Sequence, residues 1–380
     1  MHIGNNYQAF LAMVKAGLWE TEVRLASYSD ISYSCLLNTA TEQSVAGLVS
    51  AGLEHVADVK VPQTEALQFA GQTLQLEQRN KAMNAFVVSL IERLRREDVY
   101  AILVKGQGIA QCYERPLWRA CGDVDLFLSE DNYSKAIQVL SPIASSIEEE
   151  DVYRHHLAMT IDGWAVELHG TLRSGLWKSL DRELDNVQNA VFYEGKVRSW
   201  MNGGTQVSLL AADEDVVFVF AHILQHFYKE GIGLRQICDW CRLLWTYRSE
   251  LDLRLLESRI KSIGVMTEWK SFAALAVDYL GMPAEAMPLL NSLNNQEFKK
   301  FKRKAARVME FVLETGNFGH NRDYSYRKKY PYIIYKAISF WKHLKDGAFF
   351  FSIFPLDSIK VTWRRMAIGI TVVLQGKRHE

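Results

Sequence analysis

Features that would assign a chain to a specialised class are scarce in this sequence. Only 7 of the 380 residues are proline and no internal repeat is present, so long linkers and disordered segments are not expected. The longest uncharged runs near the end, residues 347–356 and 366–376, are far shorter than the roughly 20 residues that a membrane-spanning helix needs. A formal net charge of zero excludes a global electrostatic attraction to nucleic acid.

Cysteines are few, odd in number and scattered, which favours reduced thiols and a cytoplasmic location. The first residues show no basic segment followed by an apolar one, so no secretory signal is expected. Cys238 and Cys241 form a C-x-x-C pair without a second pair elsewhere. We expect both thiols to pack in the interior, a metal or redox site being the alternative.

Hydrophobic residues make up 48% of the chain and charged residues 23%, a composition that supports a sizeable core. Residues 1–95 are predicted to be helical, because stretches such as Leu74–Glu97 repeat apolar side chains every three or four positions. Residues 96–208 contain the strand-like runs, and residues 209–380 return to helical periodicity. The expected fold is therefore α+β, with N-terminal helices, a small mixed sheet as the core and a helical C-terminal domain.

The predicted elements of the core can be listed in chain order. They are a strand over 99–104, a helix from Gly108 that stops before Pro116, a strand over 123–128, a helix over 132–140, a hairpin over 155–170, and a weaker strand pair around 188–209. Asp162-Gly163 marks the hairpin turn, because a type I′ turn requires positive φ at both central residues. A long helix over 213–229 follows.

Two aspartates lie inside the strand DVDLFL. Asp123 and Asp125 are two residues apart, so they share one face of the strand, roughly 7 Å from each other. Two such carboxylates repel, and a divalent cation with a preference for oxygen ligands, Mg²⁺ or Mn²⁺, removes the repulsion. If the second strand of the hairpin lies alongside, Glu167 adds a third carboxylate, a set suited to phosphoryl or nucleotidyl transfer. The alternative is an edge strand with one face in water.

Several other polar residues are candidates for the same site. Arg119 is close enough in sequence to Asp123 to contact a phosphate bound there, or to be an ordinary partner of the acidic face. His169 shares a strand face with Glu167 and is expected to orient that carboxylate, to touch substrate, or to be a satisfied polar neighbour. Tyr113 is expected to pack in the core.

Two pairs of polar residues in the helical segments after residue 209 are expected to have structural roles. His222 and His226 have the i, i+4 spacing of metal ligands, but no third ligand accompanies them, so they are expected to be structural. Arg235 and Asp239 are also four residues apart and are expected to pair on a helix beside the cleft.

Positive charge is concentrated near the end of the chain. Residues 296–380 contain 18 Lys and Arg against 7 Asp and Glu. Aromatic residues alternate with these cations in Lys299–Arg307 and Tyr326–Lys345, which suits lipid headgroups or single-stranded nucleic acid. The simpler interpretation is a solvated helix face with aromatic core contacts. Peripheral contact with an anionic membrane is one hypothesis from this asymmetry.

The segments ILVKGQGIAQCYERPLWRACGDVDLFL and HHLAMTIDGWAVELHG resemble the uncharacterised bacterial nucleotidyltransferase family of the DNA polymerase beta superfamily. The resemblance rests on a strand ending in Lys-Gly, an Asp-hydrophobic-Asp strand and a later Glu-Leu-His, and extends more loosely to the flanking helices. It implies that Asp123 and Asp125 hold Mg²⁺–NTP. It also implies that Glu167 completes the metal site or activates the acceptor hydroxyl.

One departure concerns the turn that binds the triphosphate. The wider superfamily usually has Gly-Ser, whereas this chain has Lys105-Gly106-Gln107-Gly108 without a hydroxyl. Gly106 and Gly108 still permit close approach of the backbone to phosphate, and Lys105 supplies a point charge for the lost contact.

The leading hypothesis is a Mg²⁺-dependent transfer of a nucleoside monophosphate from an NTP, with ATP as the expected donor, to a hydroxyl of an unknown acceptor, releasing pyrophosphate. No specific nucleic acid partner is expected. A non-catalytic nucleotide- or partner-binding protein on a degenerate nucleotidyltransferase scaffold is the first alternative, and the missing Gly-Ser turn is its best support. A metal-dependent phosphotransferase or phosphohydrolase that uses the same acids is the second.

Overall fold

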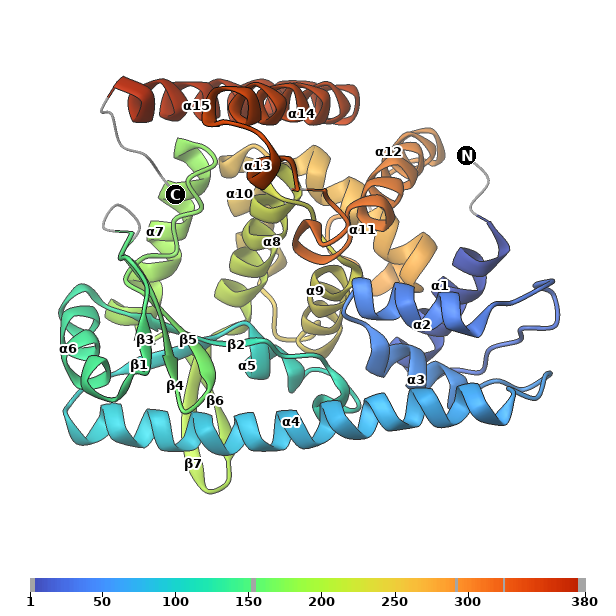
Figure 1. The fold of residues 1–380 in the computed structure, drawn as a ribbon, viewed down its shortest axis with the longest axis horizontal. Coiled ribbons are helices and arrows are strands. Elements are labelled where there is room, and N and C mark those ends of the chain that lie inside the picture. The colour runs from blue at the N-terminus through green and yellow to red at the C-terminus, as the bar shows by residue number, and fades with distance from the viewer. Residues whose placement is uncertain (1–3, 152–154, 291–292, 324, 375–380) are drawn as a thin grey trace.

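The computed structural model describes residues 4–151, 155–290, 293–323 and 325–374 (Figure 1). Its α-helices are α1 (Asn5–Trp19), α2 (Tyr33–Glu42), α3 (Ala46–Glu54), α4 (Gln63–Arg96), α5 (Gly106–Ala110), α6 (Glu130–Leu140), α7 (Lys178–Tyr193), α8 (Ala212–Lys229), α9 (Leu234–Thr246), α10 (Leu253–Ile263), α11 (Met266–Leu280), α12 (Asn295–Thr315), α13 (Tyr326–Lys329), α14 (Tyr332–Ile353) and α15 (Pro355–Leu374). Its strands are β1 (Ala101–Val104), β2 (Asp123–Leu128), β3 (Ser146–Ile147), β4 (His156–Ile161), β5 (Trp164–His169), β6 (Val197–Asn202) and β7 (Thr205–Leu210).

A small mixed sheet forms the centre, with strand order β1-β2-β5-β4-β3. Strands β2 and β5 are parallel, and the other neighbours in this sheet are antiparallel. Strands β6 and β7 form a separate two-stranded sheet. Helices precede and follow this core, so the predicted α+β class is confirmed.

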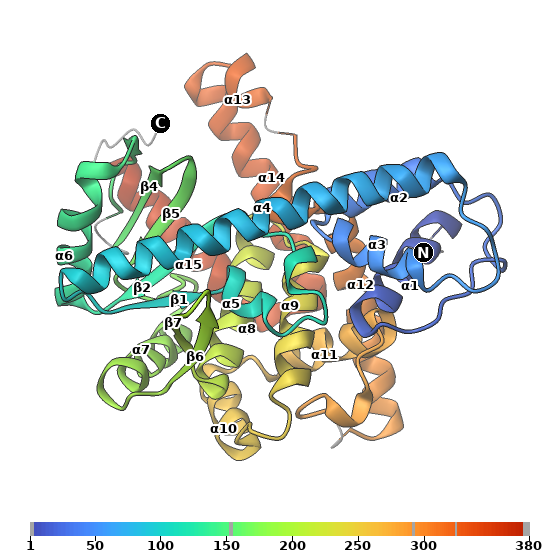
Figure 2. The same cartoon turned by 90° about the horizontal axis from the view of Figure 1, so that it is seen from below.

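The two faces of the central sheet have different environments. On β2, Val124, Leu126 and Leu128 are buried against side chains of α4, such as Val87 and Leu90. Figure 2 shows α4 crossing the front of the molecule on this side. Asp123 and Asp125 alternate with those apolar residues and therefore point to the opposite face. The alternation thus buries one face of β2 under a helix and leaves its acidic face for the cleft.

The predicted hairpin is confirmed as β4 and β5. Its turn residues Asp162 and Gly163 have φ values of 50° and 79°, as a type I′ turn requires. The next pair, β6 and β7, uses Gly203 and Gly204 at φ values of 56° and 90°. Ser129 caps α6 by accepting a hydrogen bond from the Asn132 backbone N–H.

Two predicted boundaries were wrong. The strand pair expected around 188–209 begins only at Val197, because α7 continues to Tyr193. The spacing of Leu180, Leu184, Val187 and Val191 along α7 is helical, and all four side chains are buried. The helix expected from Gly108 to Pro116 ends at Ala110, and a separate 3-10 turn begins at Pro116.

The N-terminal helices and the later helices share one core. Buried residues of α1 and α3, such as Phe10 and Val49, belong to the same cluster as Trp240 of α9 and Trp269 of α11. The division of the chain at residues 95 and 208 stays a prediction. Among the helices that the structure describes, none combines the length and apolar character needed to cross a bilayer.

Candidate functional site

The register of the sheet brings three acidic side chains together. Asp125 on β2 lies directly opposite Glu167 on β5, and Asp123 lies two residues before Asp125 on the same face. Carboxylate oxygens of the three residues all lie within 4.8 Å of one another. The strand pairing expected from the hairpin therefore produces the predicted cluster.

Two side-chain nitrogens converge on the middle carboxylate. The Lys105 Nζ and the His169 Nε2 each lie 2.8 Å from the Asp125 Oδ1. Lys105 follows β1 with a positive φ of 56°, and His169 ends β5. Asp125 is only 2% exposed, so its charge depends on these partners for compensation.

The electrostatic balance differs among the three acids. Burial alone would raise the pKa of Asp125, but the Lys105 charge and the His169 hydrogen bond hold that pKa below its usual value. The charge of Asp125, followed by burial, raises the pKa of Asp123 above its usual value. Asp123 is thus the acid of this cluster that most lacks a positive neighbour.

Glu167 is held by two histidines. Its Oε2 lies 3.2 Å from the His156 Nε2 and 3.4 Å from the His169 Nε2. These two hydrogen bonds, His156 first, lower the pKa of Glu167, so the carboxylate is ionised at neutral pH. The carboxylates of Asp125 and Glu167 in turn raise the pKa of His169, although burial opposes that shift.

The acids open into a cleft of about 460 Å³ between the sheet and the helical region. Its opposite wall is formed by His222 and His226 of α8, Arg235 of α9 and Phe318 of the turn after α12. The two imidazole rings lie 4.3 Å apart, and the ring of Phe318 is 4.6 Å from that of His226. Burial, followed by the charge of Lys105, lowers the pKa of His222 well below its usual value, so this imidazole is neutral.

Arg119 has a different partner from the one expected. Its guanidinium binds Asp239 of α9 through two contacts, Nε to Oδ1 at 3.0 Å and Nη2 to Oδ2 at 2.6 Å. The Tyr113 hydroxyl donates to the same Asp239 at 2.7 Å, so this tyrosine is buried as predicted but also hydrogen-bonded. Arg119 borders the cleft, yet this network occupies much of its donor capacity.

The expected pairing of Arg235 with Asp239 is replaced by another contact. The Arg235 Nη1 donates to the Ala120 carbonyl at 2.9 Å, and its guanidinium lies 5.6 Å from the Phe318 ring centre. The side chain lines the cleft, where its charge lowers the pKa of Asp123. The sequence-based expectation placed Arg235 on a helix beside the cleft, but it paired this cation with Asp239 and therefore missed it as a site residue.

The glycines of the turn after β1 have separate surroundings. Gly106, with a φ of 36°, lines the cleft next to Lys105. Gly108 is not among the lining residues, and a Cβ placed on it would lie 2.8 Å from the Leu209 Cδ2 on β7. Gly106 therefore permits close approach from the cleft, whereas Gly108 permits close packing of α5 against β7.

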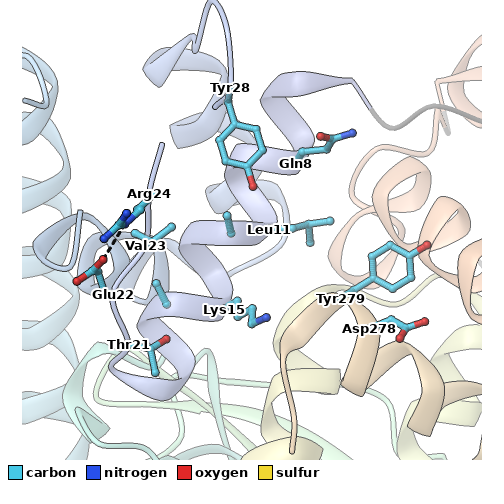
Figure 3. A pocket seen from close by; sticks show the side chains of 12 residues that line it. Gln8, Leu11, Lys15, Thr21, Glu22, Val23, Arg24, Tyr28, Asp278 and Tyr279 are labelled. Carbon is cyan, nitrogen blue, oxygen red and sulfur yellow. Dashed lines mark hydrogen bonds and ion pairs between the residues drawn. The ribbon is translucent and has the colours of Figure 1, made fainter. Parts of the chain in front are cut away.

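A further pocket of about 610 Å³ lies at the other end of the molecule, between α1 and the end of α11 (Figure 3). Lys15, Tyr28 and Tyr279 line it, and an Arg24–Glu22 ion pair lies at its side. Neither potential metal-ligating cluster of the described residues includes a residue from this pocket. The acidic cleft is therefore the stronger candidate for chemistry.

Comparison with known families decides the assignment. A family model described as uncharacterised nucleotidyltransferase matches residues 29–281, more than half of the chain. The chain belongs to this nucleotidyltransferase family. No curated protein and no solved structure matches it. Family membership supports nucleotidyl transfer in general, and the match includes the acidic cleft and the helices α8 and α9 that cover it.

The buried ion pair between Arg119 and Asp239 leads to a prediction about the stability of this nucleotidyltransferase. Asp239→Asn is expected to lower the free energy of unfolding by about 3–5 kcal/mol, because the buried Arg119 charge loses its partner. The matched control is Asp278→Asn, which breaks a partly exposed ion pair with Lys302 and is expected to cost about 0–1 kcal/mol. Urea denaturation measures both, and equal losses in the two variants would contradict the assigned role of Asp239.

Proposed function

We propose that this nucleotidyltransferase transfers a nucleoside monophosphate from Mg²⁺–NTP, with ATP as the expected donor, to a hydroxyl of an acceptor, releasing pyrophosphate. The observation that carries the proposal is the cluster of Asp123, Asp125 and Glu167 at the base of a cleft. Family membership supports the reaction class, and the carboxylate cluster supports the location of the active site in this cleft.

The donor set fits a divalent cation. Three carboxylates within 4.8 Å supply the hard oxygen ligands that Mg²⁺ and Mn²⁺ prefer. The raised pKa of Asp123 expresses its repulsion by Asp125, which a cation would relieve. Asp123, Asp125 and Glu167 would hold the metal, which when bound supplies charge stabilisation to the phosphoryl oxygens.

Two side chains on opposite walls suit the triphosphate. Lys105 reaches the cleft from the sheet side, and Arg235 reaches it from α9. Both line the same cleft as Asp123, and the charge of each lowers the pKa of that residue. We assign phosphate contacts to Lys105, Arg235 and the backbone of Gly106. Arg119 would act indirectly, by fixing α9 through Asp239.

The chemistry requires an oxygen nucleophile and a leaving group in line. The acceptor hydroxyl oxygen forms a bond to the α-phosphorus, and the bond from that phosphorus to the β-bridging oxygen breaks with its electron pair leaving on pyrophosphate. We assign to the Glu167 carboxylate, which is ionised and hydrogen-bonded to His156, the role of accepting a hydrogen bond from the hydroxyl and receiving its proton. His169 would orient Glu167 and Asp125 together.

One observation favours the non-catalytic alternative. The Lys105 ammonium already neutralises Asp125 at 2.8 Å, as a lysine would in a scaffold that had lost its metal. This alternative predicts that a nucleotide binds without Mg²⁺. The same measurement therefore separates the two functions.

Thermal unfolding with each NTP, with and without Mg²⁺, tests the proposal without knowledge of the acceptor. The wild-type protein is expected to gain about 2.7 kcal/mol at 100 times the dissociation constant, a shift of several degrees, only when Mg²⁺ is present. Asp123→Asn should abolish the shift because it removes a metal ligand. Asp162→Asn is the matched control, since this exposed turn residue has a φ of 50° that asparagine tolerates.

The outcomes separate the alternatives. A shift that is independent of Mg²⁺ and retained in Asp123→Asn would support a binding protein instead of an enzyme. If no NTP shifts the unfolding temperature at millimolar concentration, the result would contradict a nucleotide site in either function.

We further propose that the α14–α15 hairpin contacts an anionic membrane surface. This hairpin lies along the top of Figure 1, on the side away from α4, and packs inward through Phe350 and Phe354. Its outward side chains include Trp341 and Trp363, which are 71% and 75% exposed. Exposed tryptophans beside an excess of cations suit a lipid headgroup region. Two cations that precede this hairpin in the chain form ion pairs, Lys302 with Asp278 and Arg322 with Asp346.

Vesicle sedimentation measures this contact. The wild-type protein is expected to bind vesicles rich in an anionic lipid at low ionic strength and to be released by salt, because screening weakens the attraction. The double variant Trp341→Ser and Trp363→Ser should bind at least tenfold more weakly. Tyr193→Ser, which removes an aromatic side chain that is 84% exposed at the end of α7, should bind normally. Absence of wild-type binding, or equal binding by all variants, would contradict the contact.

A further inference from the structure

A second group of metal-ligating side chains lies beside the three carboxylates. His156 on β4 is directly opposite His169 on β5, and Glu167 lies two residues before His169 on the same face. The hairpin register thus places two imidazoles and one carboxylate in a row at the edge of the cleft. Glu167 belongs to both groups.

Two of the three separations within this group are close to those of a coordination shell. The His156 Nε2 and His169 Nε2 lie 3.2 Å and 3.4 Å from the Glu167 Oε2, and all three atoms lie within 4.8 Å. Ligands bound tetrahedrally at about 2.0–2.1 Å are about 3.3 Å apart. N–H···O hydrogen bonds usually span about 2.7–3.2 Å, so the 3.2 Å contact of His156 lies at the long end of that range. The two Glu167 contacts, which are hydrogen bonds in the metal-free protein, are thus also close in length to the edges of a tetrahedral metal polyhedron.

The ligand types differ from those of the carboxylate cluster. Imidazole nitrogens favour Zn²⁺ and neighbouring transition ions, whereas an oxygen-only set favours Mg²⁺. Two histidines and one glutamate are a ligand set of catalytic zinc sites, which keep one position open. The side chains of His156 and Glu167 are 32% and 29% exposed, so solvent reaches the group.

We propose that His156, Glu167 and His169 form a transition-metal site that takes Zn²⁺ or a similar ion, next to the oxygen-ligand site and joined to it by Glu167. This proposal does not rest on nucleotidyl transfer, because the ligand geometry comes from the β4–β5 hairpin alone. Metal on the His169 Nε2 replaces its hydrogen bond to Asp125, so occupancy of this site would release one of the two partners of that carboxylate.

Cobalt titration gives a direct readout. Tetrahedral Co²⁺ with nitrogen ligands absorbs visible light much more strongly than hydrated Co²⁺, and an excess of Mg²⁺ keeps the oxygen-only site from contributing. The wild-type protein is expected to develop the intense band at one equivalent of Co²⁺, and Zn²⁺ should abolish it by competition. His156→Ala and His169→Ala should lose the band.

The matched control is His155→Asn. This exposed histidine adjoins His156 but belongs to neither metal-ligating group, and its φ of 43° is one that asparagine tolerates. His155→Asn should keep the band. Far-ultraviolet circular dichroism of each metal-free variant verifies the fold, and His156→Gln serves as a second variant with a smaller loss of packing.

The double variant Asp123→Asn and Asp125→Asn separates this proposal from the proposed function. It should keep the Co²⁺ band while losing stabilisation by Mg²⁺–NTP. A wild-type protein without the band, a band retained in His156→Ala, or a band lost only in the aspartate variant would overturn the histidine site. None of these results would alter the response of the wild-type protein to Mg²⁺–NTP.

Discussion

The buried carboxylate of Asp125, shared between Lys105 and His169, is the interaction around which the rest of the site is organised. A carboxylate that is only 2% exposed is tolerable only with opposite charge in contact. The sheet order supplies both partners, because β1 and β5 flank β2. Strand β1 ends opposite Asp125, just before Lys105, and β5 places His169 two residues after the position opposite Asp125. A divalent cation bound to Asp125 would compete with Lys105 for the same oxygen and leave the ammonium available for phosphate.

The acidic face was predictable from sequence because short-range rules determine it. Alternation along the strand that contains Asp123 and Asp125 placed both on one face, and Asp162-Gly163 fixed the hairpin turn. These two facts bring Glu167 opposite Asp125 once the strands pair. The family resemblance stated from the same segments agrees with the family model that matches residues 29–281.

The opposite wall was not predictable, because it depends on long-range packing. Nothing local distinguishes His222 and His226 on an apolar helix from core histidines, and Asp239 was assigned to Arg235 because helix spacing is visible in a sequence. In the structure Asp239 binds Arg119, which lies 120 residues earlier. Helix α7 was not predicted, and a strand was expected over its last residues, although the buried residues Leu180, Leu184 and Val187 have helical spacing.

The fate of the phosphoryl groups tests the central claim most directly. The protein is incubated with Mg²⁺ and an NTP labelled at the α-phosphate, together with a small-molecule cell extract that supplies acceptors, and the products are separated. The label is expected to move to an acceptor that carries the nucleoside monophosphate while pyrophosphate is released, and Asp123→Asn is expected to form neither product. Label retained in a nucleoside diphosphate would contradict nucleotidyl transfer. Release of orthophosphate would then indicate a phosphohydrolase, and transfer of the terminal phosphoryl group to an acceptor would indicate a phosphotransferase.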